Sequence, residues 1–458
     1  MKKSIFALLA AVVIACVSGS ACSVPGSRPV NSDAGSQSDE SPYSSARNDN
    51  ESLSESFVGS ESRLESDSES MSESEDDTVA NDIKWFEFVL LNDGSGYSVS
   101  KRYDYKEETY PKNISIPGVY NGKPVTSIHD NAFYYCDSLK SVELPGSITT
   151  IGRCAFIGCG SLTSIEIPDG AISIGEGAFS RCIGLTNMTI PDSVRSIGMS
   201  AFSDCNDSIY TRENGIIYVD KWAVGVENGQ IASANIKVGT KGIANSVFSN
   251  CDNLASVVIP DSVITMGSYA FYGCRSLTNI VIPNSVKIIE RGMFSECDKL
   301  TSVGIPVGVT TIAGWAFSDC VSLTDIEIPV GVTDIGESAF YHCYNLTSVT
   351  IPDSVKEFGE NAFFMCKSLK SIEIPSGVTI IRDNTFWFCD SLASVKIPSS
   401  ITRIGSFAFS DCGSLSDFTF DGTTEQWNSV TKISNFLRNT KLNAIRCTDG
   451  DVPVLRED

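Results

Sequence analysis

The sequence predicts a repeat solenoid of the α/β class: an arc of about thirteen stacked coils with a parallel sheet on one face. A unit of 23 residues recurs from about Lys123 to Leu415. A single unit cannot bury its own apolar side, so each coil is expected to stack on the next. The period is plainest in a column of cysteines, in which every step is 23 residues except one of 46: Cys136, Cys159, Cys182, Cys205, Cys251, Cys274, Cys297, Cys320, Cys343, Cys366, Cys389 and Cys412.

Within one unit, apolar and polar residues alternate and then stop at a proline. Ile326 and Ile328 alternate with Asp325 and Glu327, which is the pattern of a strand with one buried face. A proline follows at once and ends the strand, because it has no N–H to donate. The segment 337–340 is too short for a full helix, so we expect a single helical or 3₁₀ turn there.

Two further columns bear on the core. A phenylalanine in each unit, from Phe133 to Phe409, predicts a stacked aromatic spine. The cysteine column is open to two interpretations: a disulfide framework, or small buried residues with a weak S–H donor. The second is favoured, because the position 23 residues after Cys205 holds Asn228, which can bond to the backbone but cannot form a disulfide. Cys154 and Cys447 stand outside the column, and no pairing is predicted for them.

The N-terminal segments predict export. Residues 1–21 combine two lysines with an apolar run and small residues, as in a secretory signal peptide. Cys22 and Cys16 both end lipobox-like stretches; Cys22 is preferred as the lipidated residue, and cleavage after Ala21 without lipidation is the alternative. Residues 22–80 are rich in Ser, Asp and Glu and have too few apolar residues to fold, which predicts a disordered tether.

The remaining chain divides into a solenoid and two caps. We expect an N-terminal cap and entry strand at 81–122, the solenoid at 123–415 and a C-terminal cap at 416–458. Residues 206–227 depart from the repeat, and Asn214-Gly215 between alternating segments predicts a hairpin. This hairpin is either a binding projection, with Tyr218 and Trp222 as its contact residues, or a neutral replacement for one coil.

The solvent-facing positions of the predicted strands form the candidate partner-binding surface. Most of these residues are small and polar, with acidic residues at intervals and one apolar patch. Adjacent exposed apolar residues indicate a contact surface, whereas simple solvation accounts for the polar ones. The candidates on this surface are Glu143, Glu166, Val258, Val281, Asp325, Glu327 and Glu373.

Composition and motifs exclude several classes of function. The net charge of −22 disfavours nucleic acid and anionic lipid as partners. His129 and His342 lie about nine coils apart, and Cys343 beside His342 belongs to the buried column, so we expect no nucleophilic pair. The repeated glutamates lie on an open face, where nothing raises the pKa of one above another, as glycoside hydrolysis requires. We expect no enzyme activity, no metal and no cofactor.

Ile-Pro-Asp-Ser-Val-x-x-Ile-Gly-x-x-Ala-Phe-x-x-Cys, as at 190–205, resembles the repeat of the BspA-like leucine-rich repeat family of the Treponema pallidum type. Tyr120–Cys136 resembles its entry segment; Phe420–Trp427 and Cys447–Gly450 resemble its exit. The resemblance implies a leucine-rich-repeat arc on a bacterial cell surface, where an adhesin-like protein binds a host or neighbouring-cell protein or glycan. Two alternatives remain: a structural spacer or self-associating surface protein, and a glycan-active enzyme or glycan-binding subunit.

Overall fold

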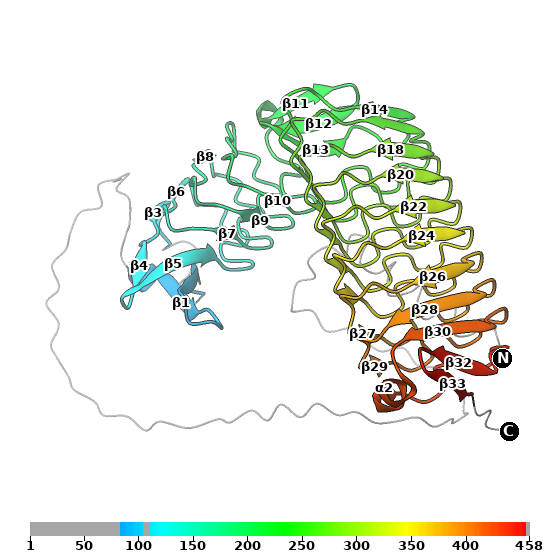
Figure 1. Ribbon diagram of the computed structural model, residues 1–458. Coiled ribbons are helices and arrows are strands. Elements are labelled where there is room, and N and C mark those ends of the chain that lie inside the picture. The colour runs from blue at the N-terminus through cyan, green and yellow to red at the C-terminus, as the bar shows by residue number, and fades with distance from the viewer. Residues whose placement is uncertain (1–82, 104–109, 455–458) are drawn as a thin grey trace, which may run out of the picture. The chain divides into compact units, whose positions relative to one another are not determined.

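The computed structural model describes residues 83–103 and 110–454. They form a solenoid of about 14 turns of roughly 23 residues with almost no helix, which confirms the predicted fold class. Figure 1 shows the coils following one another, with strands recurring at the same places in each coil. The expected signal peptide, the tether, and lipidation at Cys22 or Cys16 lie outside the described residues.

Most coils contribute a strand, usually ended by a proline, to the first of two parallel ladders. Corresponding residues pair 23 positions apart, as Asp325 does with Ser348. A side chain on the middle residue of these short strands points into the core, and those on either side face solvent. The strands of this first ladder are β3 (Asn113–Ser115), β6 (Ser141–Glu143), β8 (Ser164–Ile165), β14 (Ser233–Asn235), β16 (Ser256–Val258), β18 (Asn279–Val281), β20 (Ser302–Gly304), β22 (Asp325–Glu327), β24 (Ser348–Thr350), β26 (Ser371–Glu373), β28 (Ser394–Pro398), β30 (Asp417–Asp421) and β32 (Ala444–Cys447).

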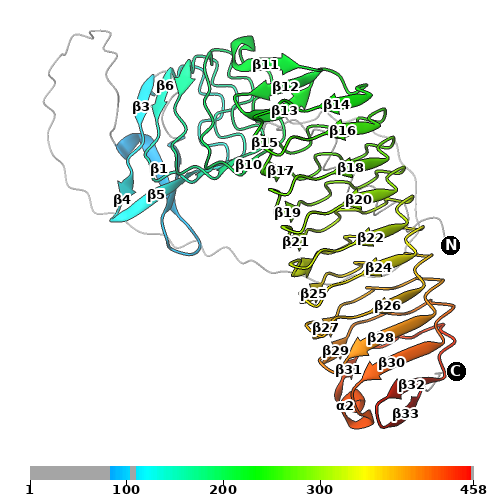
Figure 2. The same ribbon diagram turned by 45° about the horizontal axis from the view of Figure 1, so that its top comes forward.

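A second parallel ladder follows the proline in each coil. Most of its strands have two residues, of which the second is a buried apolar residue, as in Asp334–Ile335. Figure 2 shows this ladder on a different side of the coils from the first. Its strands are β5 (Lys123–Ile128), β7 (Thr150–Ile151), β9 (Ser173–Ile174), β10 (Ser196–Ile197), β15 (Gly242–Ile243), β17 (Thr265–Met266), β19 (Ile288–Ile289), β21 (Thr311–Ile312), β23 (Asp334–Ile335), β25 (Glu357–Phe358), β27 (Ile380–Ile381), β29 (Arg403–Ile404) and β31 (Thr431–Lys432).

The segment between the second ladder and the cysteine forms consecutive turns, so the predicted helical turn at 337–340 is wrong. Alternate N–H groups donate to the next coil: those of Ser338 and Phe340 donate to the carbonyls of Glu360 and Ala362. The N–H groups between them close short turns within the coil, as from Ala339 to Gly336. A helix would use all these donors within the segment and leave none for the neighbouring coil.

This turn edge requires a left-handed backbone at two positions in every cysteine-bearing coil, five residues and one residue before the cysteine. Ser338 and His342 have φ values of 54° and 58°. Gly177 and Gly273 take the same conformation without cost, because they lack a Cβ. A larger side chain at such a position costs about 1 kcal/mol. Cys154, outside the cysteine column, occupies one of these positions with φ 52°, and its side chain is buried.

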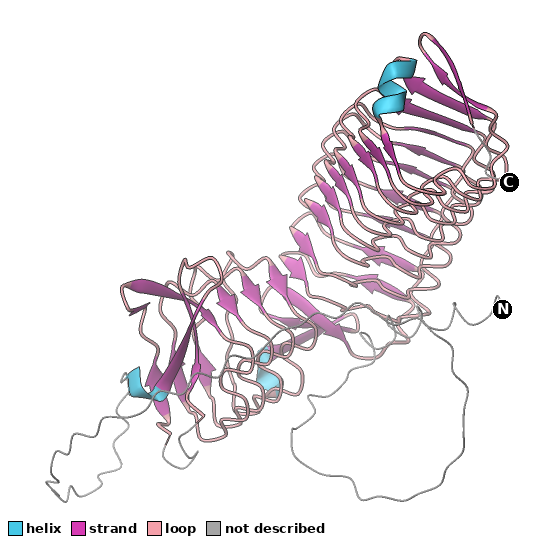
Figure 3. Cartoon of the chain, turned by 90° about the horizontal axis from the view of Figure 1, so that it is seen from below, coloured by secondary structure: helices cyan, strands magenta, loops and turns pink. Residues whose placement is uncertain are grey.

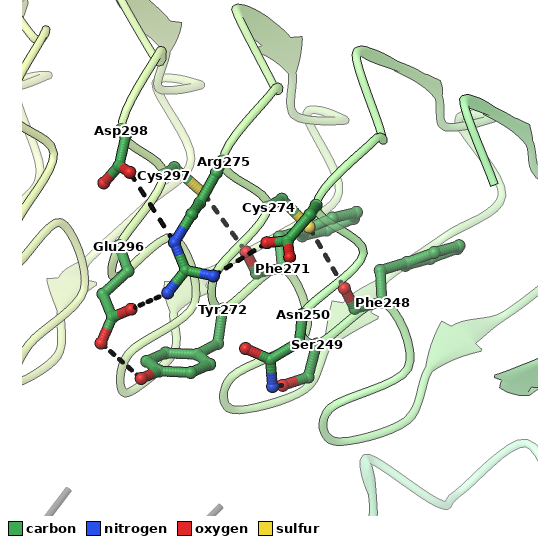
Figure 4. Close-up of polar contacts among 11 residues, drawn as sticks. Phe248, Ser249, Asn250, Phe271, Tyr272, Cys274, Arg275, Glu296, Cys297 and Asp298 are labelled. Carbon is green, nitrogen blue, oxygen red and sulfur yellow. Dashed lines mark hydrogen bonds and ion pairs between the residues drawn. The ribbon is translucent and has the colours of Figure 1, made fainter. Parts of the chain in front are cut away.

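The core is built from columns, as predicted. Phe271 and Phe294 stack with their ring centroids 5.7 Å apart and their planes 10° from parallel, and the contact repeats along the spine. The column cysteines form no disulfides with one another, and nearly all are buried. The thiol of Cys297 donates to the carbonyl of Phe271 in the preceding coil at 3.2 Å, and Cys274 bonds in the same way to Phe248 (Figure 4). The buried-thiol interpretation is therefore confirmed.

The irregular unit contains the hairpin that Asn214-Gly215 predicts. After the 3₁₀ turn Asp207–Ile209, strands β11 (Tyr210–Glu213), β12 (Ile216–Val219) and β13 (Trp222–Val226) form an antiparallel meander. β13 then pairs in parallel with β15, so the meander joins the second ladder directly. The aromatic stacking ends at Phe202 and resumes at Phe248, on either side of this unit.

Asn228 does not replace the missing cysteine, contrary to the sequence interpretation. Its side chain is exposed and accepts from the N–H of Gln230. Tyr210 takes the role instead: its hydroxyl donates to the carbonyl of Phe202 and accepts from the N–H of Cys205. The carbonyl that a cysteine of the next coil would otherwise satisfy is therefore satisfied by a tyrosine of the hairpin unit.

Both ends of the described chain carry added strands. At the N-terminal end, the 3₁₀ turn Ile83–Trp85 precedes β1 (Phe86–Leu90), which pairs antiparallel with β2 (Tyr97–Lys101); β2 pairs in parallel with β5, and β4 (Val119–Tyr120) forms a small hairpin with β5. At the other end, helix α2 (Thr424–Ser429) begins at a capping box, and its Trp427 packs against Phe418 and Phe420. β33 (Gly450–Pro453) closes the first ladder antiparallel to β32. Figure 3 shows α2 as a short helix at the end of the strands.

Candidate partner-binding surface

The solvent-facing side of the first ladder places the predicted acidic residues as expected. Glu143 is the exposed last residue of β6, and Glu166 directly follows β8 and is exposed. Asp325 and Glu327 flank the buried Ile326 in β22, and Glu373 ends β26. Side chains alternate between the two faces of a strand. Because the apolar residue before each of these carboxylates is buried, the carboxylate faces solvent.

Two valines form an apolar patch on this face. Val258 and Val281 are the last residues of β16 and β18, which lie next to each other, and their exposed fractions are 62% and 77%. Their neighbours on the adjoining strands, Asn235 and Gly304, offer little to cover them. Simple solvation explains the polar residues of this face but not two exposed valines on consecutive coils.

The sequence interpretation missed three exposed valines that share one repeat position; one of them, Val238, has an exposed fraction of 85%. Val307 and Val330 follow the strand-ending prolines of the next two coils, with exposed fractions of 78% and 80%. Each stands where Asp192 or Asp353 stands in other coils. A comparison of this column across the repeat would have found them, since the position is polar in most coils. The exposed valines thus continue beyond Val281 onto the edge of the first ladder.

Ion pairs occupy the C-terminal part of the face. Lys396 lies 2.7 Å from Glu373 and 3.1 Å from Asp421, one coil away on either side. The hydrogen bonds that Lys396 donates to these two carboxylates raise the pKa of Lys396. All three side chains are largely exposed, so the pairs contribute little to stability. The positive charge of Lys396 does reduce the net negative charge of the C-terminal part of the face. The acidic character of the face is therefore stronger in its other parts.

Tyr218 and Trp222, the predicted contact residues of the hairpin unit, belong to the core. Their exposed fractions are 1% and 2%. The Tyr218 hydroxyl accepts from the N–H of Lys237, and the Trp222 ring packs against Gly242, where a Cβ would meet it at 2.4 Å. The prediction that they are contact residues is therefore wrong, because both pack in the core. The sequence pattern indicates the strands of the hairpin but not which of their faces is buried.

An ion cluster lies beside the cysteine column at Arg275. Its guanidinium lies 2.8 Å from Asp252, 2.6 Å from Glu296 and 3.7 Å from Asp298, and Glu296 also accepts from the Tyr272 hydroxyl at 2.5 Å (Figure 4). Burial raises the pKa of Asp298. One arginine thus connects three successive coils, so the cluster has a structural role.

The histidine, cysteine and acidic side chains of the described residues bear on metal binding and nucleophilic chemistry. In residues 83–103 and 110–454, no three His, Cys, Asp or Glu side chains are grouped to hold a metal ion. His342 Nδ1 lies 2.9 Å from Asp319, but the adjacent Cys343 donates its thiol proton to the Phe317 carbonyl. Burial raises the pKa of Cys343 well above its usual value, which opposes formation of a thiolate nucleophile. The same residues contain no helix with the length and hydrophobicity of a membrane span.

Comparisons with known proteins agree with this architecture. The family model for the BspA type leucine-rich repeat region matches residues 104–223, 226–347 and 333–450. Similar solved structures include a leucine-rich repeat protein from Bacteroides ovatus, with 28% identity over 79% of this chain and 89% of that chain and a TM-score of 0.40. A leucine-rich cell surface protein from Faecalibacterium prausnitzii has 30% identity over 79% of this chain and 100% of its own, with a TM-score of 0.35.

The leucine-rich repeat protein of T. pallidum is also similar, with 27% identity over 53% of this chain and 90% of that chain and a TM-score of 0.26. The search of curated proteins found no match. The family model describes a repeat region and names no catalytic activity. Because that model covers well over half of the sequence, the chain belongs to the BspA type leucine-rich repeat family.

Proposed function

We propose that this protein is an extracellular, surface-anchored binding protein that recognises a host or neighbouring-cell partner through the outward side of its first ladder. The anchor is a lipid on Cys22, or alternatively on Cys16, and residues 22–80 form the tether. The signal-like N-terminus and the family support export. The proposal contains no catalytic step, no metal and no cofactor.

The exposed pair Val258 and Val281 carries the proposal. Burying one such side chain fully is worth about 1.5 kcal/mol, and these two are already partly covered, so a partner that covers both gains about 2 kcal/mol. That gain corresponds to a roughly thirty-fold change in affinity. The acidic residues farther along the same face, such as Glu327 two coils beyond Val281, favour a partner surface with basic groups at its rim, which a protein supplies more readily than an uncharged glycan.

The experiment that tests the proposal is a binding screen of the chain against arrays of matrix proteins, mucins and glycans at two salt concentrations. The proposal predicts saturable binding to one class of partner. A contact centred on the acidic first-ladder face weakens as salt increases, because the exposed charges are screened. Absence of binding at micromolar concentrations by the folded protein would contradict the proposal and favour the structural spacer.

A further inference from the structure

Strand β1 forms the outer edge of the sheet β1-β2-β5-β7-β9-β10 and pairs with β2 on one side only. Figure 1 shows it at the N-terminal end of the coils. Just past one end of β1, the N–H of Leu91 donates to the carbonyl of Gly96. Just before its other end, the carbonyl of Trp85 accepts from the N–H of Arg102. Backbone groups alternate in direction along an antiparallel strand, so these two bonds fix which residues of β1 turn their backbone toward β2.

The N–H and C=O groups of Phe86, Phe88 and Leu90 therefore point away from β2, along the outer edge. None of these groups has a hydrogen-bond partner among the residues that the structure describes. An edge of this kind is a template for a further strand, because one added strand would pair all these groups at once.

β1 also lacks the features that usually protect an edge strand. Its five residues include no proline and no glycine, and Glu87 is the one charged residue among them. Val89 and Leu90 have exposed fractions of 46% and 47%. At the other end of the solenoid, the edge strand β33 contains Asp451 and Pro453, which oppose the addition of a strand. The contrast indicates that the edge of β1 accepts a partner strand and that the edge of β33 does not.

We propose that the partner is β1 of a second copy of this chain, paired antiparallel about a two-fold axis at Phe88. In this register Phe88 lies opposite Phe88 of the second copy, and Phe86 lies opposite Leu90. The residues whose backbone groups point outward then form the hydrogen-bonded pairs, so every outward group is paired. Both copies use the same strand, so the contact closes as a dimer and does not extend into a fibre.

The side chains of β1 suit pairing with a copy of itself. On the side of the strand that holds the buried Phe86, the half-exposed Leu90 lies next to Phe86 of the second copy. On the other side, Glu87 lies opposite Val89 of the second copy, so the two carboxylates do not face each other. The strand is therefore self-complementary in this register.

The charges beside the strand are complementary as well. Lys84 precedes β1 and Asp93 follows it, so the antiparallel register brings Lys84 of each copy to the turn that contains Asp93 of the other. Residues 22–80 of the chain itself are a poorer partner for this edge. They are rich in aspartate and glutamate, which are depleted in strands and would add negative charge next to Glu87.

This edge belongs to the sheet of the second ladder, so the inference does not depend on recognition through the first ladder. One short strand pair buries less than the roughly 1,600 Å² of a standard stable interface, so we expect a reversible dimer with micromolar affinity.

The test is sedimentation velocity of the full chain from low micromolar to near-millimolar concentrations, where a monomer–dimer equilibrium is expected. Leu90→Pro removes an outward N–H and leaves the hydrogen bonds to β2 in place, so it should weaken the dimer about ten-fold or more. Urea unfolding shows whether this variant is folded. Hydrogen exchange provides a second readout, because the amides of β1 should exchange more slowly as the concentration of the unmodified chain increases.

Charged residues at Val89 test the register and do not alter the backbone. Val89→Glu places a carboxylate opposite Glu87 of the second copy at two symmetric positions and should weaken the dimer by about five-fold, whereas Val89→Lys should strengthen it by about the same factor. Val330→Glu and Val330→Lys are the matched controls, because Val330 is an exposed valine several coils away from β1. Both controls should dimerise like the unmodified chain.

The inference is overturned if the chain stays monomeric throughout this range or if the folded Leu90→Pro variant dimerises unchanged. Shifts of the same sign for both charges at Val89 would contradict the antiparallel register, and a dimer lost only in the Val330 variants would move self-association to the first ladder. A monomeric chain that still binds a partner through Val258 and Val281 would refute this inference and leave the proposed function intact.

Discussion

The thiol of Cys297 donates to the carbonyl of Phe271, 26 residues earlier in the chain and one coil away, at 3.2 Å. The same carbonyl also accepts from the N–H of Cys274 within its own coil. One carbonyl oxygen therefore accepts a hydrogen bond from the turn of its own coil and another from the cysteine of the next coil. Repetition of this bond explains why cysteine, a small residue with one weak donor, recurs at the position without forming disulfides.

Replacing Cys297 with alanine is expected to lower the free energy of unfolding by about 1–2 kcal/mol, through the lost bond and the small cavity. Cys251→Ala is the matched control, because Cys251 is equally buried and its thiol donates to no acceptor among the described residues. Urea unfolding followed by circular dichroism measures both. Equal losses in the two variants would show that the thiol bond contributes nothing.

The left-handed turn positions predict opposite outcomes for two glycine substitutions. Gly177 has φ 60°, and an added Cβ would lie 3.3 Å from the Cys154 sulfur, so Gly177→Ala should destabilise the protein by about 1–2 kcal/mol. Gly146 lies outside the left-handed region, with open space around it, so Gly146→Ala should be neutral or slightly stabilising. Thermal unfolding distinguishes the two. A neutral Gly177 variant would refute the strain argument.

Tyr210 is expected to be a structural residue of the hairpin unit. Tyr210→Phe leaves the Phe202 carbonyl and the Cys205 N–H without the hydroxyl, which should cost about 1–3 kcal/mol. Tyr341→Phe is the control, since that hydroxyl makes no hydrogen bond with the described residues. The difference is measurable as a shift in the urea midpoint. Indistinguishable midpoints would remove Tyr210 from its assigned role.

The buried thiols predict a loss of stability at alkaline pH. Burial raises the pKa of Cys205 and Cys251 to about 11, from a usual value of 9.0, and that of Cys297 well above it. Below pH 9 the folded and unfolded chains both keep these protons. Above it the unfolded chain releases protons that the folded chain retains, so each thiol lowers the stability by about 1.4 kcal/mol per pH unit until its folded pKa is reached.

The free energy of unfolding should therefore be nearly constant from pH 7 to 8.5 and fall steeply by pH 10.5. Burial also raises the pKa of Tyr272, which acts in the same direction. Urea titrations at these pH values test the prediction, and slow reaction of the folded protein with a thiol reagent at pH 8 provides an independent check. Constant stability through pH 10.5 would contradict the assignment of a buried, protonated column.

The sequence predicts the columns well because periodicity reports which residues meet one coil later. The phenylalanine spine, the column of buried cysteines without disulfides and the hairpin at Asn214-Gly215 all follow from local rules. Periodicity does not report the sign of φ. The left-handed positions hold residues as different as Gly177, Trp315 and His342, and only their frequent glycine, asparagine and aspartate content signals the turn edge.

The wrong predictions for the irregular unit have a different cause. The coils on either side of this unit do not repeat its pattern, so periodicity gives no information about it. Asn228 was assigned from its register alone, although the meander had moved that position away from the core. Tyr218 and Trp222 are contact residues only in the alternative in which the hairpin projects, whereas pairing of β13 with β15 turns these rings into the solenoid. Tertiary pairing, which no local pattern contains, decides both.

The most direct measurement is the affinity of the unmodified chain and of Val258→Lys/Val281→Lys for the partner identified in the binding screen. Thr350→Lys is the control, because Thr350 is the exposed last residue of β24, at the same strand position but away from the patch. We predict that the valine variant loses at least thirty-fold in affinity while the control loses little. Equal affinities for all three folded proteins would contradict recognition through the first-ladder face.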